Sequence, residues 1–296
     1  MCLISIIMPL GNNEKYIHDA IKSVLNQSFV DFELIILNFE SIDNALSIAG
    51  PFKDKRICIV KEPMDYVHSL NVGIEKSSGK YISLMYADDI MHVDRLKIQY
   101  ATMEAEPTIT VCSTRMKQMS DTIVSGSITN IPCGWIDNPL LSFLRGNRIF
   151  HFTAMIRKNF LIEHDLHYEN CCPVEDFKLW VEIAKNKGQF YIDSQFLHYH
   201  RISDSEVNKQ KDERQKQATD QIINEILEYL ADMYKEIHPE LQSMLTGFKE
   251  LQHKELIKKQ DMAIFFYNLF KKIYDTTRFS NLSNLSIKKF DHFINH

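Results

Sequence analysis

The stretch Asn71-Val-Gly-Ile-Glu-Lys-Ser-Ser-Gly-Lys-Tyr-Ile-Ser-Leu-Met-Tyr-Ala-Asp-Asp-Ile90 gives the strongest indication of the fold. It predicts a short helix, a glycine stop at Gly79 and an apolar strand that ends in the adjacent carboxylates Asp88 and Asp89. Because α/β sheets bind ligands at the carboxyl ends of their strands, this pair is expected at a binding edge. Carboxylate oxygens there suit Mg²⁺ or Mn²⁺ carrying a phosphate group, so Asp88 and Asp89 are candidate metal ligands.

The same alternation of strand and helix extends outward from this stretch over the first hundred residues. Nearly continuous apolar runs predict buried strands, and apolar residues at helical spacing predict the helices between them. This order predicts an α/β domain with a mostly parallel sheet and right-handed crossovers. The expected strands are 3–8, 32–37, 56–60 and 81–85, and the expected helices are 14–26, 41–49, 67–76 and 94–104.

The pattern changes in the second half of the chain. Strands are expected at 108–112, 150–156 and 190–199, with a helix at 176–185. After about residue 205 the sequence becomes strongly polar, and helical spacing returns in later segments. We therefore predict an α/β domain at 1–205 and an all-helical domain at 206–296, with helices at 221–237, 239–251 and 255–276.

Composition narrows the class of protein. The 296 residues are 45% hydrophobic and 25% charged, as in soluble globular proteins with a substantial core. A net charge of -5 argues against a nucleic-acid binder that depends on phosphate contacts. The six cysteines form no CxxC pair, and the apolar N-terminus runs only to Pro9, which indicates a first strand and not a signal peptide. We therefore expect a cytoplasmic protein with reduced thiols.

A second acidic pair, Glu175 and Asp176, opens the helix expected at 176–185. The helix dipole stabilises carboxylates at this position, so the pair could be purely structural. A carboxylate is also able to act as a general base when a hydroxyl group attacks an activated donor. The residues alone leave both roles open.

Taken together, these segments resemble family 2 glycosyltransferases, which are inverting enzymes with a GT-A fold. The resemblance extends from the first strand to about residue 207. The segments that carry it are Ile6-Ile-Met-Pro-Leu-Gly-Asn-Asn-Glu-Lys-Tyr-Ile17, Ser23-Val-Leu-Asn-Gln-Ser-Phe29, Asp31-Phe-Glu-Leu-Ile-Ile36, Asn71-Val-Gly-Ile74, Gly79-Lys-Tyr-Ile82, Ala87-Asp-Asp-Ile90 and Glu175-Asp176.

The resemblance implies a nucleotide-sugar donor held at the carboxyl edge of the strands and a saccharide or lipid-linked acceptor. It implies a Mg²⁺ or Mn²⁺ ion on Asp88 that neutralises the diphosphate leaving group. It makes Asp176 the catalytic base, with Glu175 as the substitute. The residues expected to contact the nucleotide sugar are Pro9, Leu10, Gly11, Asn38, Phe39, Asn71, Ala87 and Asp88.

Four departures from the family pattern fall in the donor site. Phe39 stands where the family has an aspartate that binds the uracil ring, and Tyr86 replaces the first carboxylate of Asp-x-Asp-Asp. Leu10-Gly11 replaces Thr-Tyr, and Ser203 replaces a histidine. Either the donor is not a standard uridine diphosphate sugar, or the chain is a catalytically inactive GT-A pseudoenzyme that binds a carbohydrate or a partner. Because the metal and base positions remain, we favour an active enzyme.

The last predicted helix has a basic amphipathic pattern. Lysines flank an apolar face that would suit an anionic membrane surface, as an enzyme with a lipid-linked acceptor would need. The same face could instead pack against the catalytic domain or a second subunit in a homodimer. The combined prediction is sugar transfer in bacterial surface polysaccharide biosynthesis, in the cytoplasm or peripherally at the inner face of the membrane. The apolar face consists of Met262, Phe265, Phe266, Leu269, Phe270 and Ile273.

Overall fold

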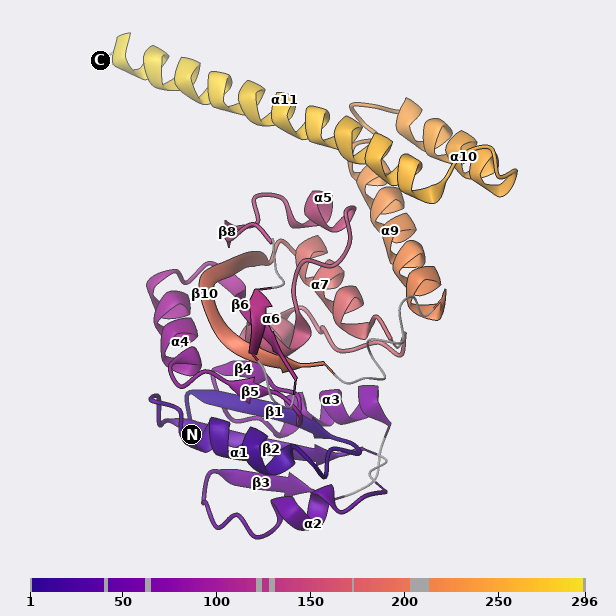
Figure 1. Ribbon diagram of the computed structural model, residues 1–296. Coiled ribbons are helices and arrows are strands. Elements are labelled where there is room, and N and C mark those ends of the chain that lie inside the picture. Colours follow the sequence, from indigo (N-terminus) through magenta and orange to yellow (C-terminus); the bar gives the residue numbers. More distant parts are fainter. Residues whose placement is uncertain are drawn as a thin grey trace. The chain divides into compact units, whose positions relative to one another are not determined.

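A computed structural model describes residues 2–39, 42–61, 65–120, 124–127, 131–171, 173–202 and 213–294 (Figure 1). Ser203, one of the departures from the family pattern, lies outside the described residues. The chain divides into two compact units, one of residues 1–139 and 147–218 and the other of residues 140–146 and 219–296. The division predicted from sequence, 1–205 and 206–296, differs from this one at the boundary and in the short segment 140–146.

The first unit is built on a mixed β-sheet. Within the described residues ten strands pair in the order β3-β2-β1-β4-β9-β6-β10-β5, with β7 on β6 and β8 on β10. Strands β1 to β4 are parallel, as predicted, whereas β9 runs antiparallel between β4 and β6. The strands are β1 (Ile4–Leu10), β2 (Phe32–Asn38), β3 (Ile57–Val60), β4 (Tyr81–Leu84), β5 (Ile90–Met91), β6 (Ile109–Met119), β7 (Val124–Ser127), β8 (Gly134–Trp135), β9 (Met155–Arg157) and β10 (Gln189–Arg201).

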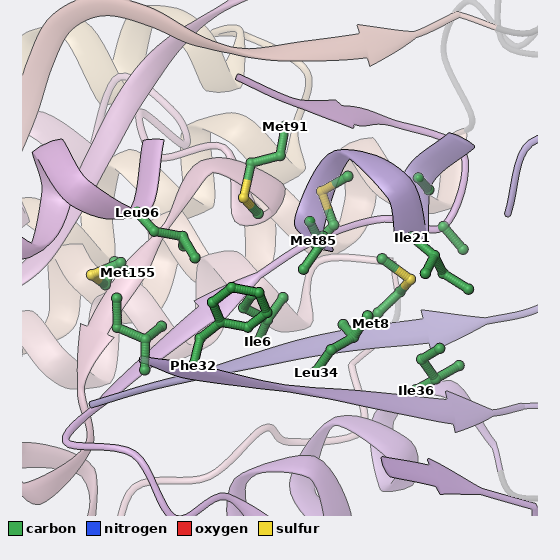
Figure 2. Close-up of a cluster of buried hydrophobic side chains, with 14 of the residues drawn as sticks. Ile6, Met8, Ile21, Phe32, Leu34, Ile36, Met85, Met91, Leu96 and Met155 are labelled. Carbon is green, nitrogen blue, oxygen red and sulfur yellow. The ribbon is translucent and has the colours of Figure 1, made fainter. Parts of the chain in front are cut away.

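Strand β1 lies at the centre of the parallel part, and every residue in it is buried. Helices cover both of its faces: Ile6 and Met8 pack with Ile21 of α1 (Figure 2), while Ile7 lies on the α3 side. A Cβ on Gly73 of α3 would come within 2.9 Å of Ile7, so glycine allows this helix to approach the sheet closely. The helices of this unit include α1 (Ile17–Leu25), α2 (Ala45–Ala49), α3 (Tyr66–Lys76), α4 (Arg95–Ala105), α6 (Lys158–Glu163) and α7 (Glu175–Lys185), and the short α5 (Pro139–Phe143) spans the boundary between the units.

The carboxyl ends of three central strands meet at one edge of the sheet. Leu10 at the end of β1 pairs with Asn38 at the end of β2, and β4 runs parallel to both. Strand β10 is long and curved (Figure 1), with register irregularities against β6 on both sides of Phe196. Bulges of this kind bend a strand. Because β10 runs parallel to β6, its carboxyl end, Arg201, lies at the same edge as the end of β4.

The strand predicted at 150–156 is wrong in its first half. Residues His151–Thr153 form a 3₁₀ turn, and only Met155–Arg157 pairs as β9. The backbone carbonyls of Phe152 and Thr153 accept hydrogen bonds from the side chains of Arg95 and Gln99 in α4. Side chains of a helix therefore take the place that a neighbouring strand would occupy.

Besides the segment 140–146, the second unit contains most of α9 (Glu213–Met233), together with α10 (Glu240–His253) and α11 (Lys259–Ile294). The apolar face predicted on the last helix is partly buried within this unit. Phe266 and Phe270 are fully buried, and Phe248 of α10 stacks on Phe265 with ring centroids 4.7 Å apart. The other two helices of the unit thus account for much of this face. No helix in the described part of the chain is long and apolar enough to cross a membrane.

Candidate active site

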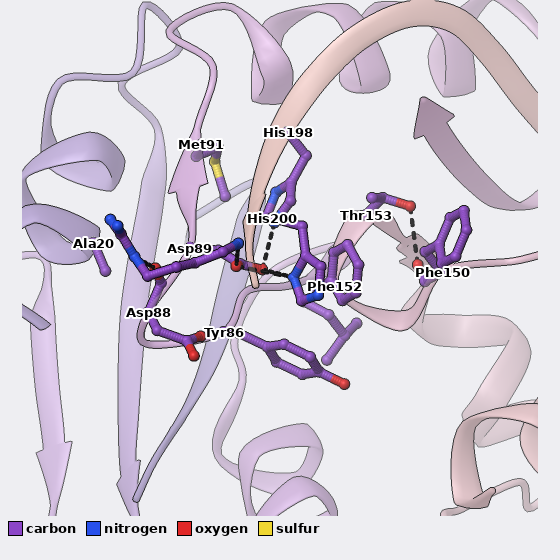
Figure 3. A network of polar contacts seen from close by, with 12 residues as sticks. Ala20, Tyr86, Asp88, Asp89, Met91, Phe150, Phe152, Thr153, His198 and His200 are labelled. Carbon is purple, nitrogen blue, oxygen red and sulfur yellow. Dashed lines mark hydrogen bonds and ion pairs between the residues drawn. The ribbon is translucent and has the colours of Figure 1, made fainter. Parts of the chain in front are cut away.

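The two aspartates after β4 have different surroundings. Asp88 is partly exposed, whereas Asp89 is fully buried. Figure 3 shows the Asp88 carboxylate directed away from the cluster that Asp89 forms with two histidines. Adjacent residues of the same type therefore have different roles in this turn.

Asp89 joins the end of β4 to the end of β10. Its Oδ2 lies 2.7 Å from Nε2 of His198, and its Oδ1 lies 3.0 Å from Nδ1 of His200 (Figure 3). The backbone N–H of Arg201 also donates to Oδ1 at 2.8 Å. In turn, Nε of Arg201 donates to the backbone carbonyl of Asp88 at 2.9 Å. These bonds fix the backbone position from which the Asp88 side chain extends.

The buried groups Arg95, His198 and Asp89 form a chain of hydrogen bonds, here called the buried bridge. Burial alone would raise the pKa of Asp89, but His198 and His200 lower it to about 2. Burial lowers the pKa of His198 to about 4 and that of Arg95 to about 9. At neutral pH a neutral His198 therefore accepts from Nη1 of Arg95, 3.0 Å from its Nδ1, and donates to ionised Asp89.

This geometry bears on the predicted metal site. Both oxygens of Asp89 already accept hydrogen bonds, so its carboxylate acts as an anchor between strands. The part of the chain that the structure describes contains no group of three or more His, Cys, Asp or Glu residues that could hold a metal ion. Mg²⁺ is commonly held by one or two carboxylates together with substrate phosphates. The partly exposed Asp88 is a carboxylate that fits this mode of binding.

The second acidic pair lies at the start of α7. Asp176 is partly exposed, and its carboxylate accepts from the backbone N–H of Phe177 at 2.7 Å and from Nδ2 of Asn147 at 2.9 Å. Burial and the neighbouring charge of Glu175 raise the pKa of Asp176 to about 7 despite these bonds. Glu175 itself is only 6% exposed. A carboxylate whose pKa lies near neutrality is suited to accept a proton from a hydroxyl group.

Tyr86 links the end of β4 to the acidic pair. Its pKa is raised well above its usual value by burial, by Tyr66 and by the charges of Asp176 and Glu175, so its hydroxyl stays neutral. That hydroxyl forms a hydrogen bond with Tyr66 and lies 3.5 Å from Nδ1 of His151. The carboxyl end of β4 and the start of α7 are therefore close enough for their groups to interact electrostatically.

His151 and Asn71 belong to the support of this region. His151 is 3% exposed, and its Nε2 lies 2.8 Å from the hydroxyl of Tyr168, so it is a hydrogen-bonded core histidine. Both ends of the Asn71 amide bond to the backbone of Tyr168, each at 2.9 Å. Asn71 thus positions the 168 segment, and its contact with a nucleotide sugar remains a prediction.

The other residues expected to contact the nucleotide sugar differ in where their side chains lie. Pro9, Leu10 and Ala87 are buried, and the side chains of Leu10 and Ala87 belong to the hydrophobic core. Asn38, at the end of β2, is 8% exposed, and its Nδ2 donates to the backbone carbonyl of Lys61 at 3.5 Å. Gly11 and Phe39 lie together at the carboxyl edge of β1 and β2. The structure therefore brings Gly11 and Phe39 to the expected edge, while the side chains of Leu10 and Ala87 face the core.

The sequence of the first unit matches a known family. A profile described as Glycosyl transferase family 2 matches residues 5–168, more than half of the chain. The chain belongs to glycosyl transferase family 2. The match confirms the resemblance that the sequence motifs indicated, and it covers the β4 turn with both aspartates but ends before Glu175 and Asp176.

Relatives within this glycosyltransferase family come from several organisms. A Haemophilus influenzae protein described as "Uncharacterized glycosyltransferase" is 32% identical over 196 residues, which covers 62% of this chain and 60% of the relative. A second such protein from H. influenzae is 39% identical over 103 residues, covering 33% of this chain and 41% of the relative. The matches thus span 60% or less of either relative. A Rickettsia typhi protein described as an uncharacterized glycosyltransferase is 24% identical over 286 residues, which covers 89% of this chain and 80% of the relative.

Solved structures give the fold. Staphylococcus aureus TarS 1–349 in complex with UDP-GlcNAc matches with a TM-score of 0.60 and 17% identity, covering 90% of this chain and 80% of TarS 1–349. The complex of the same protein with UDP gives a TM-score of 0.58 at 18% identity, covering 80% and 74%. The predicted GT-A fold is confirmed by this likeness together with the mixed sheet.

Sequence reasoning missed the residues that hold Asp89. Arg95, His198 and His200 carry the buried bridge, and Arg201 connects it to Asp88. One signal was present, because His198 and His200 alternate along β10 and so share a face of the sheet. Nothing in the sequence showed which carboxylate that face would meet.

Proposed function

We propose that this chain transfers a sugar from a nucleoside diphosphate donor to a hydroxyl group of a saccharide or lipid-linked acceptor, with inversion at the anomeric carbon. The observation that carries the proposal is the partly exposed Asp176 carboxylate at the start of α7, held by Asn147 and the N–H of Phe177, with its pKa raised to about 7 by burial and Glu175. The charge of Asp176 raises the pKa of Tyr86, which lies at the proposed donor edge, so the two side chains are close to each other. A base in this state is matched to deprotonating an alcohol at neutral pH.

The proposed reaction is a single displacement at the anomeric carbon of the donor. Asp176 takes the proton of the acceptor hydroxyl as that oxygen forms a bond to the anomeric carbon. The bond from the anomeric carbon to the diphosphate oxygen breaks, and the nucleoside diphosphate leaves with the electron pair. A single displacement of this kind inverts the anomeric centre. Asn147 and the N–H of Phe177 orient the carboxylate during the step.

Asp88 is proposed to hold a Mg²⁺ or Mn²⁺ ion. Such an ion would supply a positive charge to the diphosphate leaving group. Arg201 fixes the backbone carbonyl of Asp88, and the anchor at Asp89 fixes the rest of the turn. The chain contributes a preset carboxylate at the edge where the donor is proposed to lie.

Asp88→Ala should abolish metal-dependent nucleotide binding. Loss of an outer partner of a metal ligand costs about 10- to 100-fold in metal affinity, so loss of the ligand should cost at least as much. Calorimetry with uridine, cytidine and guanosine diphosphates, with and without Mn²⁺, measures this. Asp94→Ala is the matched control, because the Asp94 carboxylate accepts a hydrogen bond from the Ser28 hydroxyl at 2.7 Å. This variant should bind nucleotide as the wild type does. Binding that is equally strong in Asp88→Ala would contradict the metal role, and no binding to any nucleotide would favour the pseudoenzyme.

The rate of transfer should depend on pH through Asp176. Its pKa is raised to about 7, so the base form is present above that pH and is lost as the pH falls through it. We expect kcat/KM to decline about tenfold per pH unit below about pH 7, because only the ionised carboxylate accepts the proton. Initial rates measured between about pH 5 and about pH 9 give the dependence of kcat/KM on pH. A rate that is constant down to pH 5 would exclude Asp176 as the base.

The cellular role is also proposed. A saccharide or lipid-linked acceptor would place the chain in bacterial surface polysaccharide biosynthesis, in the cytoplasm or at the inner face of the membrane. Lys259 and Lys271 each form an ion pair, with Asp220 and Asp275 respectively, so a basic helix surface in contact with lipid would have to compete with these carboxylates.

A further inference from the structure

Phe39 occupies the space that a side chain at residue 11 would fill. A Cβ built on Gly11 would lie 2.8 Å from Cζ of Phe39, with the two Cε atoms at 3.3 and 3.4 Å. A Cβ contact below 3.0 Å requires something to shift, so any other residue at position 11 displaces the ring. The backbone N–H of Phe39 donates to the carbonyl of Leu10 at 2.9 Å, which holds the two positions side by side. Gly11 and Phe39 are therefore a complementary pair.

A second aromatic residue supports the ring of Phe39. The Tyr66 ring lies edge-on to it, with centroids 5.2 Å apart and an interplanar angle of 66°. Edge-to-face contacts of this kind are favourable. The Tyr66 hydroxyl bonds to that of Tyr86, so both positions at which a family carboxylate is missing are linked through one tyrosine. Phe39 and Tyr86 thus each interact with Tyr66.

The Phe39 ring offers a nucleobase different chemistry from a carboxylate. Phe39 is partly exposed at the carboxyl edge of β2, and its ring has no hydrogen-bond acceptor for the ring N–H of uracil. An aromatic face stacks on any base, because every base has a π-face. A site that reads a base by a buried hydrogen bond rejects analogues lacking that bond, and a stacking face does not.

We propose that the base of the donor nucleotide stacks on the ring of Phe39, which Gly11 and Tyr66 hold in place. The site then selects its nucleotide by stacking and not by a hydrogen bond to the pyrimidine N3–H. The proposal rests on the proposed function, since it assumes a nucleoside diphosphate donor. On this proposal, two departures from the family pattern are one coupled change: Phe39 replaces the aspartate at position 39, and Gly11 replaces the aromatic residue at position 11 and leaves room for the Phe39 ring.

Calorimetric titration of the full chain in Mn²⁺ tests the proposal with UDP, CDP and the diphosphate of N3-methyluridine. The three affinities should agree within about threefold, because stacking tolerates each ring. Phe39→Leu keeps an apolar side chain over Gly11 but removes the π-face, and it should weaken binding of all three by about tenfold or more. Phe39→Trp should retain binding. Thermal unfolding of each variant shows whether it remains folded.

Gly11→Ala provides an independent arm. Its Cβ would push the Phe39 ring away, so it should weaken the same three ligands in the wild-type background and add little to Phe39→Leu. If UDP binds but N3-methylation abolishes binding, or if folded Phe39→Leu binds as well as wild type, the stacking proposal is overturned and the transferase proposal stands. If wild type binds GDP but none of these three diphosphates, the stacking proposal is overturned and the transferase proposal stands. If it binds none of the four, both are overturned.

Discussion

Asp176→Asn should leave a folded protein whose rate of sugar transfer is lower by about 10²- to 10⁴-fold, the usual contribution of general base catalysis. The amide cannot accept the proton of the acceptor hydroxyl, but its oxygen is still able to accept the N–H of Phe177. The loss should fall on kcat, with the KM for the donor little changed. Steady-state rates at pH 8 with saturating donor measure the effect, because the wild-type carboxylate is ionised there.

Glu175→Gln is the matched control for this variant. The charge of Glu175 helps to raise the pKa of Asp176, so its removal should shift the acid limb of the pH profile to lower pH while transfer continues. A structural role for both residues would not move a pH profile in this way. If Glu175→Gln abolishes transfer and Asp176→Asn does not, Glu175 is the base and the assignment must be exchanged.

Local patterns sufficed for the parallel half of the sheet. The runs that became β1, β2 and β4 are apolar and almost entirely buried, and the shorter apolar run of β3 lies at the edge of the sheet with only Val60 buried. Parallel order then brings the ends of β1, β2 and β4 to one edge, which is why Asp88 could be placed there from sequence. The predicted strand at 150–156 failed because its carbonyls bond to Arg95 and Gln99, more than fifty residues earlier in the chain.

The two aspartates show where sequence reasoning ends. Asp88 and Asp89 are the same residue type in adjacent positions, and the motif offered both as metal ligands. Their difference arises from His198 and His200, which β10 brings to Asp89 from more than a hundred residues away. The pair Gly11 and Phe39 shows the same limit of sequence reasoning. Each departure from the family pattern was visible in the sequence, but the contact between the two residues was not.

Asp89→Ala should lower the free energy of unfolding by about 3–5 kcal/mol, the range observed when one partner of a buried charged pair is removed. Arg95 is fully buried, and its charge is compensated through neutral His198 by the ionised Asp89. Without that carboxylate, the N–H groups of His198, His200 and Arg201 lose their acceptor as well. Urea unfolding of the variant and the wild type measures the difference.

The same measurement separates an anchor from a metal ligand when it is made in EDTA. If Asp89 acted mainly through a bound ion, chelation would remove its contribution from the wild type, and Asp89→Ala would then unfold at the same urea concentration. If Asp89 is the anchor, the full difference persists in EDTA. Asp88→Ala is the comparison, because its partly exposed side chain should change stability by less than about 1 kcal/mol under these conditions. Large destabilisation by Asp89→Ala with little by Asp88→Ala would assign support of the turn to Asp89 and leave metal binding to Asp88.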